Sequence, residues 1–137
     1  MSTATMVNNA ATVSSMYEAF GKGDIAAILA SVDDSCLWIG AGGEYTNQGG
    51  TYRGKEVGNF FKKLDEGTEF TAFNPIAIHN INDNEVVAFG NMSGNSRKTG
   101  KSSSSDWAMH FRFNDDGKLV YFQDFFNTAA AYVSNIA

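Results

Sequence analysis

A single carboxylate stands out in an aromatic stretch near the end of the sequence. Asp124 lies within the segment Leu119 to Phe126, and the two-residue period of a strand puts its side chain on the same face as Phe122 and Phe126. A charge among bulky apolar side chains is costly unless it is paired or takes part in chemistry. Because such burial raises the pKa of a carboxyl group, Asp124 is a candidate general acid or base. The open alternative is a structural acid that pairs with a tyrosine, an indole N–H or an amide.

Other reactive side chains are isolated in the sequence. His110 has the opposite strand parity from Met109, so it should point away from the face that carries Asp124. The direction of His79 stays open, and two histidines on separate strands do not make a metal site without a third ligand. Cys36 is the one cysteine, which excludes an internal disulfide and a cysteine-based metal cluster. We therefore expect no metal and no cofactor.

The stretch from Gly94 to Ser102 resembles a phosphate-binding loop only superficially. Five residues rather than four separate its glycines, and a strand rather than a helix is expected to follow. Without a helix N-terminus, such a loop lacks the aligned N–H groups that bind phosphate. We expect Gly94 to Ser105 to form a glycine- and serine-rich hairpin loop, whose role stays open.

The elements that must position Asp124 are predicted to be antiparallel strands. Apolar residues at every second position from Trp107 to Phe113 indicate one strand, and the run Asn114 to Gly117 is typical of a hairpin turn into the strand of Asp124. Two earlier strands are predicted at Thr68 to Ile81, with a bulge at its proline, and at Glu85 to Ser93.

Helices are predicted in the first half. Apolar residues recur at helical spacing from Val13 to Phe20, and the glycines that follow end that helix. Asp24 is a suitable N-cap for a second helix, which precedes a short strand from Cys36 to Ala41. A third helix begins near Gly54. The order α-α-β-α-β-β-β-β is an α+β layout, and we expect a single domain over 1–137 with an ordered core of about 7–130.

Composition excludes several classes of protein. The net charge of −5 argues against nucleic acid, where affinity comes from neutralising phosphates. No apolar run approaches the roughly 20 residues of a membrane span. The start, MSTATMVNNAAT, lacks the basic and apolar regions of a secretory signal. We expect a cytoplasmic protein that binds neither nucleic acid nor membrane.

Several motifs in this order resemble one superfamily. The run MYEAFGKGDIAAILASV resembles the opening helix pair of the nuclear transport factor 2-like superfamily. GTYRGKEVGNFF is similar to the third helix of its SnoaL-like, ketosteroid isomerase-related branch, and W-x-x-H-F-R-F, DGK-L and F-x-D-F-F-N-T resemble that branch's final strands. The likeness extends from Val13 to Ala130. It implies a cone-shaped, curved antiparallel sheet wrapped around the three helices, in the cystatin-like manner, with an enclosed pocket.

The resemblance does not carry over the steroid isomerase machinery. The positions of the oxyanion tyrosine, the general base and the oxyanion acid fall at Met16, near Ile39 and at Met109. Tyr17 is next to the first of these, about 100° around the helix. Methionine and isoleucine cannot donate to a developing oxyanion. We therefore do not expect steroid isomerisation.

The resemblance does place Asp124 on a catalytic position. Limonene-epoxide hydrolases carry a catalytic aspartate in a similar last strand, and Phe122 to Phe126 matches that run. The arginine and second acid of that catalytic set fall near Asn91 and Ser93, so they are missing. In SnoaL-like cyclases a further aspartate position falls at Asn127.

These observations predict an enclosed pocket for a small hydrophobic molecule. We expect Asp124 to supply acid–base chemistry of the isomerase, cyclase or hydrolase type. The alternatives are a ligand-binding protein without turnover and a dimerisation module. The residues predicted to bind the ligand are Met16, Ile39, Phe61, Asn91, Trp107, Met109, Phe122 and Phe126.

The opposite face of the hairpin predicts a homodimer. Tyr121 and Phe125 have the other strand parity, beside Ala108, His110 and Arg112 of the neighbouring strand. With helices on one side only, this outer face meets water, and large aromatic residues seldom form an exposed patch on a monomer. We expect a two-fold homodimer that buries Tyr121 and Phe125, with His110 and Arg112 toward its rim.

Overall fold

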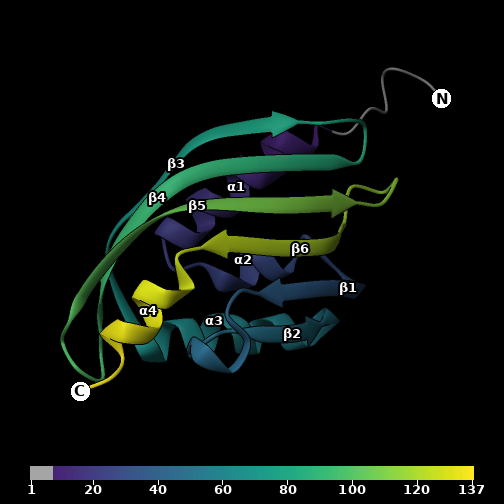
Figure 1. Cartoon of the computed structure of the whole chain (residues 1–137). Coiled ribbons are helices and arrows are strands. Elements are labelled where there is room, and N and C mark those ends of the chain that lie inside the picture. Colours follow the sequence, from purple (N-terminus) through teal and green to yellow (C-terminus); the bar gives the residue numbers. More distant parts are fainter. Residues whose placement is uncertain (1–7) are drawn as a thin grey trace.

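The structure is a computed structural model that describes residues 8–137, a six-stranded sheet with helices packed against it. The predicted start of the ordered core at residue 7 lies outside the described residues. In chain order the elements are α1 (Asn9–Gly21), α2 (Ile25–Leu29), β1 (Val32–Gly40), η2 (Gly43–Tyr45), β2 (Gly50–Arg53), η3 (Gly54–Glu56), α3 (Val57–Gly67), β3 (Thr68–Asn80), β4 (Glu85–Ser96), β5 (Ser102–Phe113), β6 (Leu119–Phe126) and α4 (Thr128–Ser134). Figure 1 shows their arrangement.

The sheet has the strand order β2-β1-β6-β5-β4-β3, and it is mixed rather than purely antiparallel. β1 pairs in parallel with β6, with Trp38 beside Phe122, whereas every other neighbouring pair is antiparallel. The expectation of an antiparallel sheet is therefore wrong at this one pair. β2 is a further strand that the sequence did not predict, because its glycine-rich flanks are typical of a loop.

The three early helices are confirmed, and their caps explain where they begin. The side chains of Asn8 and Asp24 cap α1 and α2. They accept hydrogen bonds from the backbone N–H groups of Ala11 and Ala27, and each of these bonds is 3.1 Å long. The third helix begins as the 3-10 turn η3 and continues as α3. The predicted bulge is confirmed too, since the register of β3 against β4 shifts between Pro75 and Ala77.

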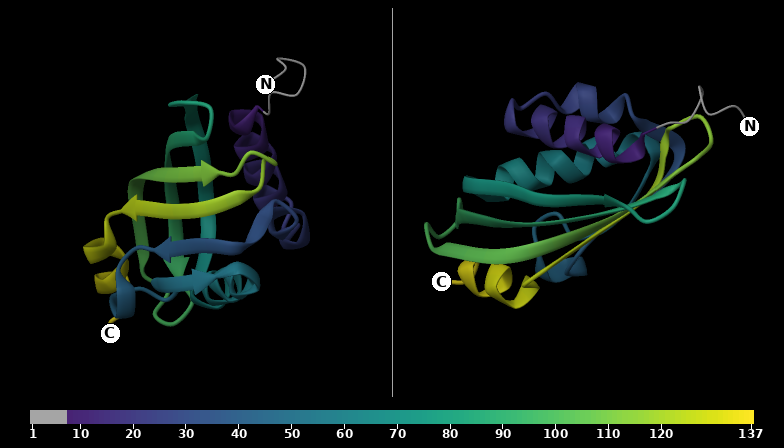
Figure 2. Two further views of the ribbon diagram at one scale, coloured as in Figure 1. Left: turned by 90° about the vertical axis from the view of Figure 1, so that its right-hand side faces the viewer. Right: turned by 90° about the horizontal axis from the view of Figure 1, so that it is seen from above.

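The helices α1, α2 and α3 cover one side of the sheet, and the long strands β3 to β5 curl at one end (Figure 2). α1 packs on β3 and β4, and α3 on β2 and β3. The core lies between these layers and is rich in aromatic residues from both. Its largest fully buried side chains are Val13, Cys36, Val57, Val86, Phe111 and Leu119.

The end of the sequence departs from expectation in two ways. Gly94 to Ser105 is not a loop: β4 and β5 continue through most of it, with Gly94 opposite Ser103, and only 97–101 turns. Beyond β6 the chain forms α4, which begins where β6 stops and packs against the part of β5 that extends further (Figure 1). Asn127 caps α4 by accepting from Ala130 N–H over 3.0 Å.

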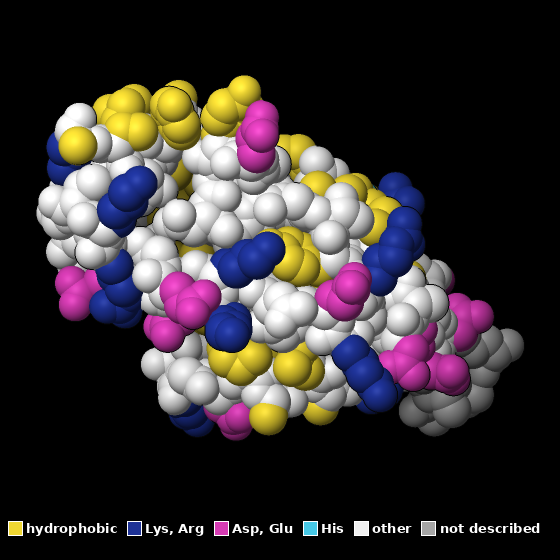
Figure 3. Space-filling model, turned by 90° about the horizontal axis from the view of Figure 1, so that it is seen from below, with side chains coloured by type: hydrophobic (Ala, Val, Ile, Leu, Met, Phe, Trp, Pro, Cys, Tyr) yellow, Lys and Arg dark blue, Asp and Glu magenta, His cyan; other side chains and the backbone are white. Residues whose placement is uncertain are grey.

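The surface around α4 carries exposed apolar side chains. Tyr45, Tyr132, Val133 and Ile136 are all more than two-fifths exposed, and the Tyr45 and Tyr132 rings meet edge to face at 5.6 Å. Seen from below, apolar side chains gather along one edge while charged ones are scattered over the rest of that face (Figure 3). No helix within residues 8–137 has the length and apolar character needed to cross a membrane.

Candidate functional site

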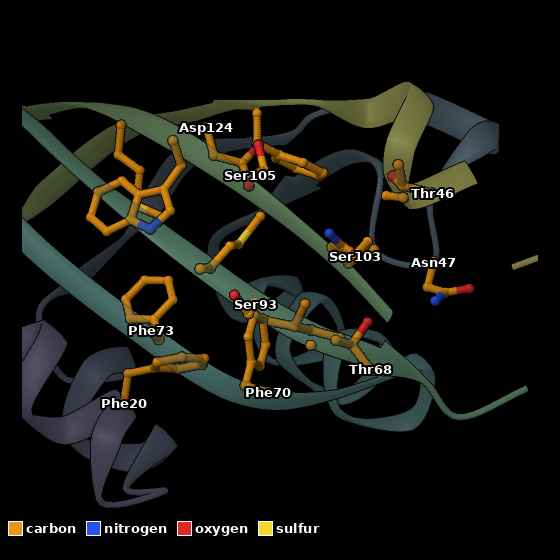
Figure 4. A pocket seen from close by; sticks show the side chains of 18 of the residues that line it. Phe20, Thr46, Asn47, Thr68, Phe70, Phe73, Ser93, Ser103, Ser105 and Asp124 are labelled. Atoms are coloured by element: carbon orange, nitrogen blue, oxygen red, sulfur yellow. The ribbon is translucent and has the colours of Figure 1, made fainter. Parts of the chain in front are cut away.

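An aromatic cavity lies between the inner face of the sheet and helices α1 and α3. The cavity has a volume of about 130 Å³. The aromatic residues that line it are Tyr17, Phe20, Trp38, Phe60, Phe61, Phe70, Phe73, Trp107, Phe111, Phe122 and Phe126. Figure 4 shows Phe20, Phe70 and Phe73 on one side of it and Asp124 with Ser105 on another.

Most residues predicted to bind a ligand line this cavity. They are Met16, Phe61, Trp107, Met109, Phe122 and Phe126, together with Asp124. Ile39 and Asn91 do not line it. Ile39 stands between the buried Trp38 and Gly40, so strand alternation turns it to the outer face. The side chain of Asn91 instead accepts from Nδ2 of Asn74 over 2.9 Å, across the β3–β4 pair.

Asp124 is buried in the middle of β6, with 5% of its surface exposed. Its Oδ1 accepts a hydrogen bond of 2.6 Å from the backbone N–H of Ala41, the residue after β1. Burial raises the pKa of this carboxyl to about 6, while the backbone N–H groups of Ala41 and of Asp124 itself act in the opposite direction. The group can therefore gain or lose a proton close to neutral pH.

Tyr17 is a second polar group in the cavity. Its hydroxyl donates to the thioether sulfur of Met109 over 3.1 Å, and a thioether is a weak acceptor. Burial, and then the negative charge of Asp124, raise the pKa of Tyr17 above its usual value, so the hydroxyl keeps its proton. In the sequence analysis, the oxyanion tyrosine of the steroid isomerases corresponded to Met16, one residue before Tyr17. The helical spacing of Tyr17 with Val13 could have placed it on the inner face.

The end of the cavity near α4 is polar. Hydroxyl groups of Ser93, Ser103 and Ser105 lie on one side of it, and Thr46 and Asn47 come from the segment after η2 (Figure 4). The residues of α4 that line this end are Ala130, Ala131 and Ser134. The sequence analysis did not predict this polar end, because it assigned the serines to a loop and predicted no helix after β6.

α4 is tied to the β4–β5 hairpin at this end. The hydroxyl of Thr99 donates to the carbonyl of Ser134. Ser96 Oγ donates to Asn135 Oδ1 over 2.7 Å, and the N–H of Asn127 donates to Ser105 Oγ over 2.8 Å. These bonds hold the helix across the polar end of the cavity.

The remaining reactive residues lie away from the cavity. His110 faces outward, as predicted, with its Nε2 2.6 Å from Glu85 Oε2, and His79 is exposed. Cys36 is fully buried, and burial raises the pKa of its thiol to about 12. Within residues 8–137 no three histidine, cysteine, aspartate or glutamate side chains come together as a metal site.

Comparison with known proteins gives one family. The sequence model of the SnoaL-like domain family matches residues 13–122. An NTF2-like protein from Burkholderia thailandensis has the same fold with a TM-score of 0.85 and 28% identity, over 96% of this chain and all of that one. The structure of TerC co-crystallised with polyporic acid is similar in fold, with a TM-score of 0.77 and 22% identity over 93% of this chain and 97% of that one.

One curated relative matches over a shorter stretch. Patulin synthesis protein F of Aspergillus clavatus is 40% identical over 53 residues, which is 36% of this chain. That stretch spans 27% of the relative's own length.

Proposed function

The chain belongs to the SnoaL-like domain family, and we propose that it binds a small, mostly apolar molecule in the cavity and that Asp124 transfers a proton on it. The observation that carries this proposal is a buried carboxyl group inside an aromatic cavity, where burial raises its pKa to about 6. A desolvated carboxylate is a stronger base than one in water, because it has lost the hydration that stabilises its charge.

The chemistry that fits is proton abstraction next to a carbonyl group. Asp124 takes a proton from the carbon beside the carbonyl, and the electron pair of that C–H bond moves toward the carbonyl oxygen. The Tyr17 hydroxyl, held only by a sulfur, can turn its proton to that oxygen. Return of the proton from Asp124 to another carbon of the conjugated system gives an isomerase. Attack of the new carbon nucleophile on a second carbonyl carbon moves that carbonyl's electron pair to its oxygen, which takes the proton from Asp124, and gives a cyclase.

A binding protein without turnover is the alternative. It is favoured by the lining of the cavity within residues 8–137, where Asp124 has no lysine, arginine, histidine or second acid beside it. A hydrolase of the aspartate–arginine–aspartate type would need an arginine and a second acid beside Asp124. In this alternative Asp124 orients the ligand and changes no bond.

Deuterium exchange separates the two candidates. The probe is 2-tetralone, a small bicyclic ketone with acidic C–H groups beside its carbonyl, followed by proton NMR in D₂O. The proposal expects wild-type protein to accelerate exchange, with a rate that rises with pH through about 6 as Asp124 ionises. Asp124→Asn should lose the acceleration while its affinity for the ketone changes by tenfold or less.

The control is Asp106→Asn, which removes an exposed carboxylate of the same sheet and should keep the wild-type rate. Binding of 2-tetralone without accelerated exchange would leave the binding alternative. Exchange that persists in Asp124→Asn would contradict the role of Asp124.

We also propose a homodimer through the outer face of the sheet. Phe89, Ala108 and Phe125 follow one another across β4, β5 and β6 on that face, and both phenylalanines are nearly half exposed. Tyr121 lies further along the same face of β6, opposite Arg112, whose guanidinium carbon is 4.9 Å from the centroid of the Tyr121 ring. A second copy related by a two-fold axis would cover this aromatic row with its own.

A further inference from the structure

Gln48 carries a buried amide that has no hydrogen-bond partner among the described residues. The residue is 8% exposed and lines the cavity, in the segment between η2 and β2. Its backbone carbonyl accepts from the Tyr52 hydroxyl over 2.9 Å, whereas its side-chain amide forms no hydrogen bond within residues 8–137. The nearby hydroxyl of Thr46 is satisfied by contrast, because it donates to the carbonyl of Ala41 over 2.6 Å.

The amide of Gln48 is open to the cavity. Trp38 and Trp107 also line the cavity, but their unpaired indole nitrogens are sealed from water, and the amide of Gln48 is not. Thr46 and Gln48 are buried while Asn47 between them is exposed, so the segment turns Gln48 inward. A molecule in the cavity can therefore reach this amide.

The fold holds Gln48 close to Asp124. A Cβ at Gly40 would lie only 2.5 Å from the backbone oxygen of Gln48, so the two backbones are in contact there. The residue after Gly40 is Ala41, whose N–H donates to Asp124. The bond from Tyr52 fixes the backbone of Gln48 in this place. One small ligand can therefore contact both the carboxyl of Asp124 and the amide of Gln48.

The chemistry of an amide indicates which ligand group it binds. An amide offers N–H donors and a C=O acceptor without a net charge, so it can both donate to a hydroxyl group and accept from it. A site that is built to bind a hydroxyl rejects an analogue without one, because its own buried polar group then stays unpaired. Within residues 8–137 no lysine or arginine lines the cavity to offset an anion, which would also face the charge of Asp124.

We infer that Gln48 is a specificity-determining residue, and that the ligand is an uncharged aromatic ketone with a hydroxyl group that binds the Gln48 amide. This inference rests on the proposed function of the cavity. The aromatic walls hold the ring of the ligand, its ketone lies at Asp124 and Tyr17, and its hydroxyl group lies at Gln48.

The test compares derivatives of 2-tetralone in two matched pairs. The pairs are the 6-hydroxy and 6-methyl compounds and the 7-hydroxy and 7-methyl compounds, in which groups of nearly the same size differ in hydrogen bonding. In calorimetric titrations, we expect wild type to bind at least one hydroxy compound more tightly than its methyl partner, by roughly threefold or more.

Gln48→Met removes the amide at nearly constant length. This variant should lose the preference for the hydroxy compound, while its affinity for the methyl compound stays within about threefold of wild type. The matched control is Asn59→Met, which removes an exposed amide of α3 that does not line the cavity. The control should keep the wild-type preference.

A second measurement uses the wild-type fold. The chain has two glutamines, so selective ¹⁵N labelling gives two pairs of side-chain amide signals. Gln123→Met assigns them, because the pair that remains belongs to Gln48. We expect the preferred hydroxy compound to shift the Gln48 amide protons downfield relative to its methyl partner. The signals of Gln123, whose Oε1 accepts from Tyr121, should not move.

The other outcomes are distinguishable. If neither pair shows a preference for the hydroxyl group, the inference is overturned and the proposed function stands. A preference that survives in Gln48→Met, or one without a shift of the Gln48 signals, also overturns it, since the hydroxyl would then meet another group such as Ser103. Failure of all four compounds to bind wild type contradicts the proposed function of the cavity itself.

Discussion

The backbone N–H of Ala41 donates to Oδ1 of Asp124 over 2.6 Å and so joins the end of β1 to the acid in the middle of β6. The bond fixes the direction of the carboxyl group, and it is stronger when that group is ionised. It therefore opposes the effect of burial. Burial is the larger of the two, and the pKa of Asp124 stays above that of a free aspartate.

The first prediction concerns that pKa directly. In a ¹³C NMR titration, the carboxyl carbon of Asp124 should titrate at about 6, because the cavity disfavours the charged form. Asp124→Asn identifies the resonance by its disappearance. A value at or below 4 would remove the acid–base role near neutral pH.

The second prediction concerns stability as a function of pH. The carboxyl of Asp124 ionises near pH 4 in the unfolded chain and near pH 6 in the folded protein, so its ionisation destabilises the fold as pH rises through this window. Asp124→Asn has no carboxyl group at this position, so it does not lose folding stability in this way as pH rises. The variant should therefore gain stability relative to wild type by roughly 3 kcal/mol between pH 3.5 and pH 7. Urea unfolding at several pH values measures the difference, and a constant difference would contradict the raised pKa.

The third prediction concerns the close approach of Gly90 and Trp107. A Cβ at Gly90 would overlap the backbone oxygen of Asn74 and the indole ring of Trp107. Gly90→Ala should therefore destabilise the fold by about 1–3 kcal/mol and move the indole resonance of Trp107. The matched control is Gly21→Ala at the end of α1, where a Cβ meets open space. That change should be neutral or stabilising by up to about 1 kcal/mol.

The fourth prediction concerns assembly. Sedimentation equilibrium at tens of micromolar should show a dimer for wild type and a monomer for Tyr121→Glu/Phe125→Glu, because two carboxylates would be buried against a second copy. The control is Tyr132→Glu, which changes an exposed aromatic residue of α4 and should leave the dimer intact. A monomeric wild type, or a double variant that still dimerises, would contradict the proposed interface.

The sequence predicted well those elements whose signals are local. The helical spacing from Val13 to Phe20, the N-cap at Asp24 and the alternation from Trp107 to Phe113 each reflect which side chains one element buries, and the structure confirms these elements. The position of Asp124 on the inner face followed from the same alternation. It required no knowledge of which strands are neighbours.

Features set by long-range pairing were not predictable in this way. Ile39 was predicted to line the pocket, but its neighbour Trp38 lines it instead. A shift of one residue in a strand exchanges its two faces. The alternation in β1 also does not reveal whether its neighbour runs parallel or antiparallel. The serines from 102 to 105 resemble a loop by composition, yet ladder hydrogen bonds to β4 hold them in a strand. In each case the conformation depends on the neighbouring strand, which is distant in the sequence.

The parallel pair between β1 and β6 has a consequence for how the chain acquires this structure. Trp38 pairs with Phe122, and most of the sequence lies between them. Contacts between such distant segments slow folding. During synthesis, β1 leaves the ribosome long before Leu119–Phe126. Trp38 can pack early on Phe60 and Phe61 of α3, but the edge of β1 that pairs with β6 stays open until the end of the chain is made. We expect Trp38 to reach its native fluorescence in the last kinetic phase of refolding, and this strand to be where a chaperone engages the nascent chain.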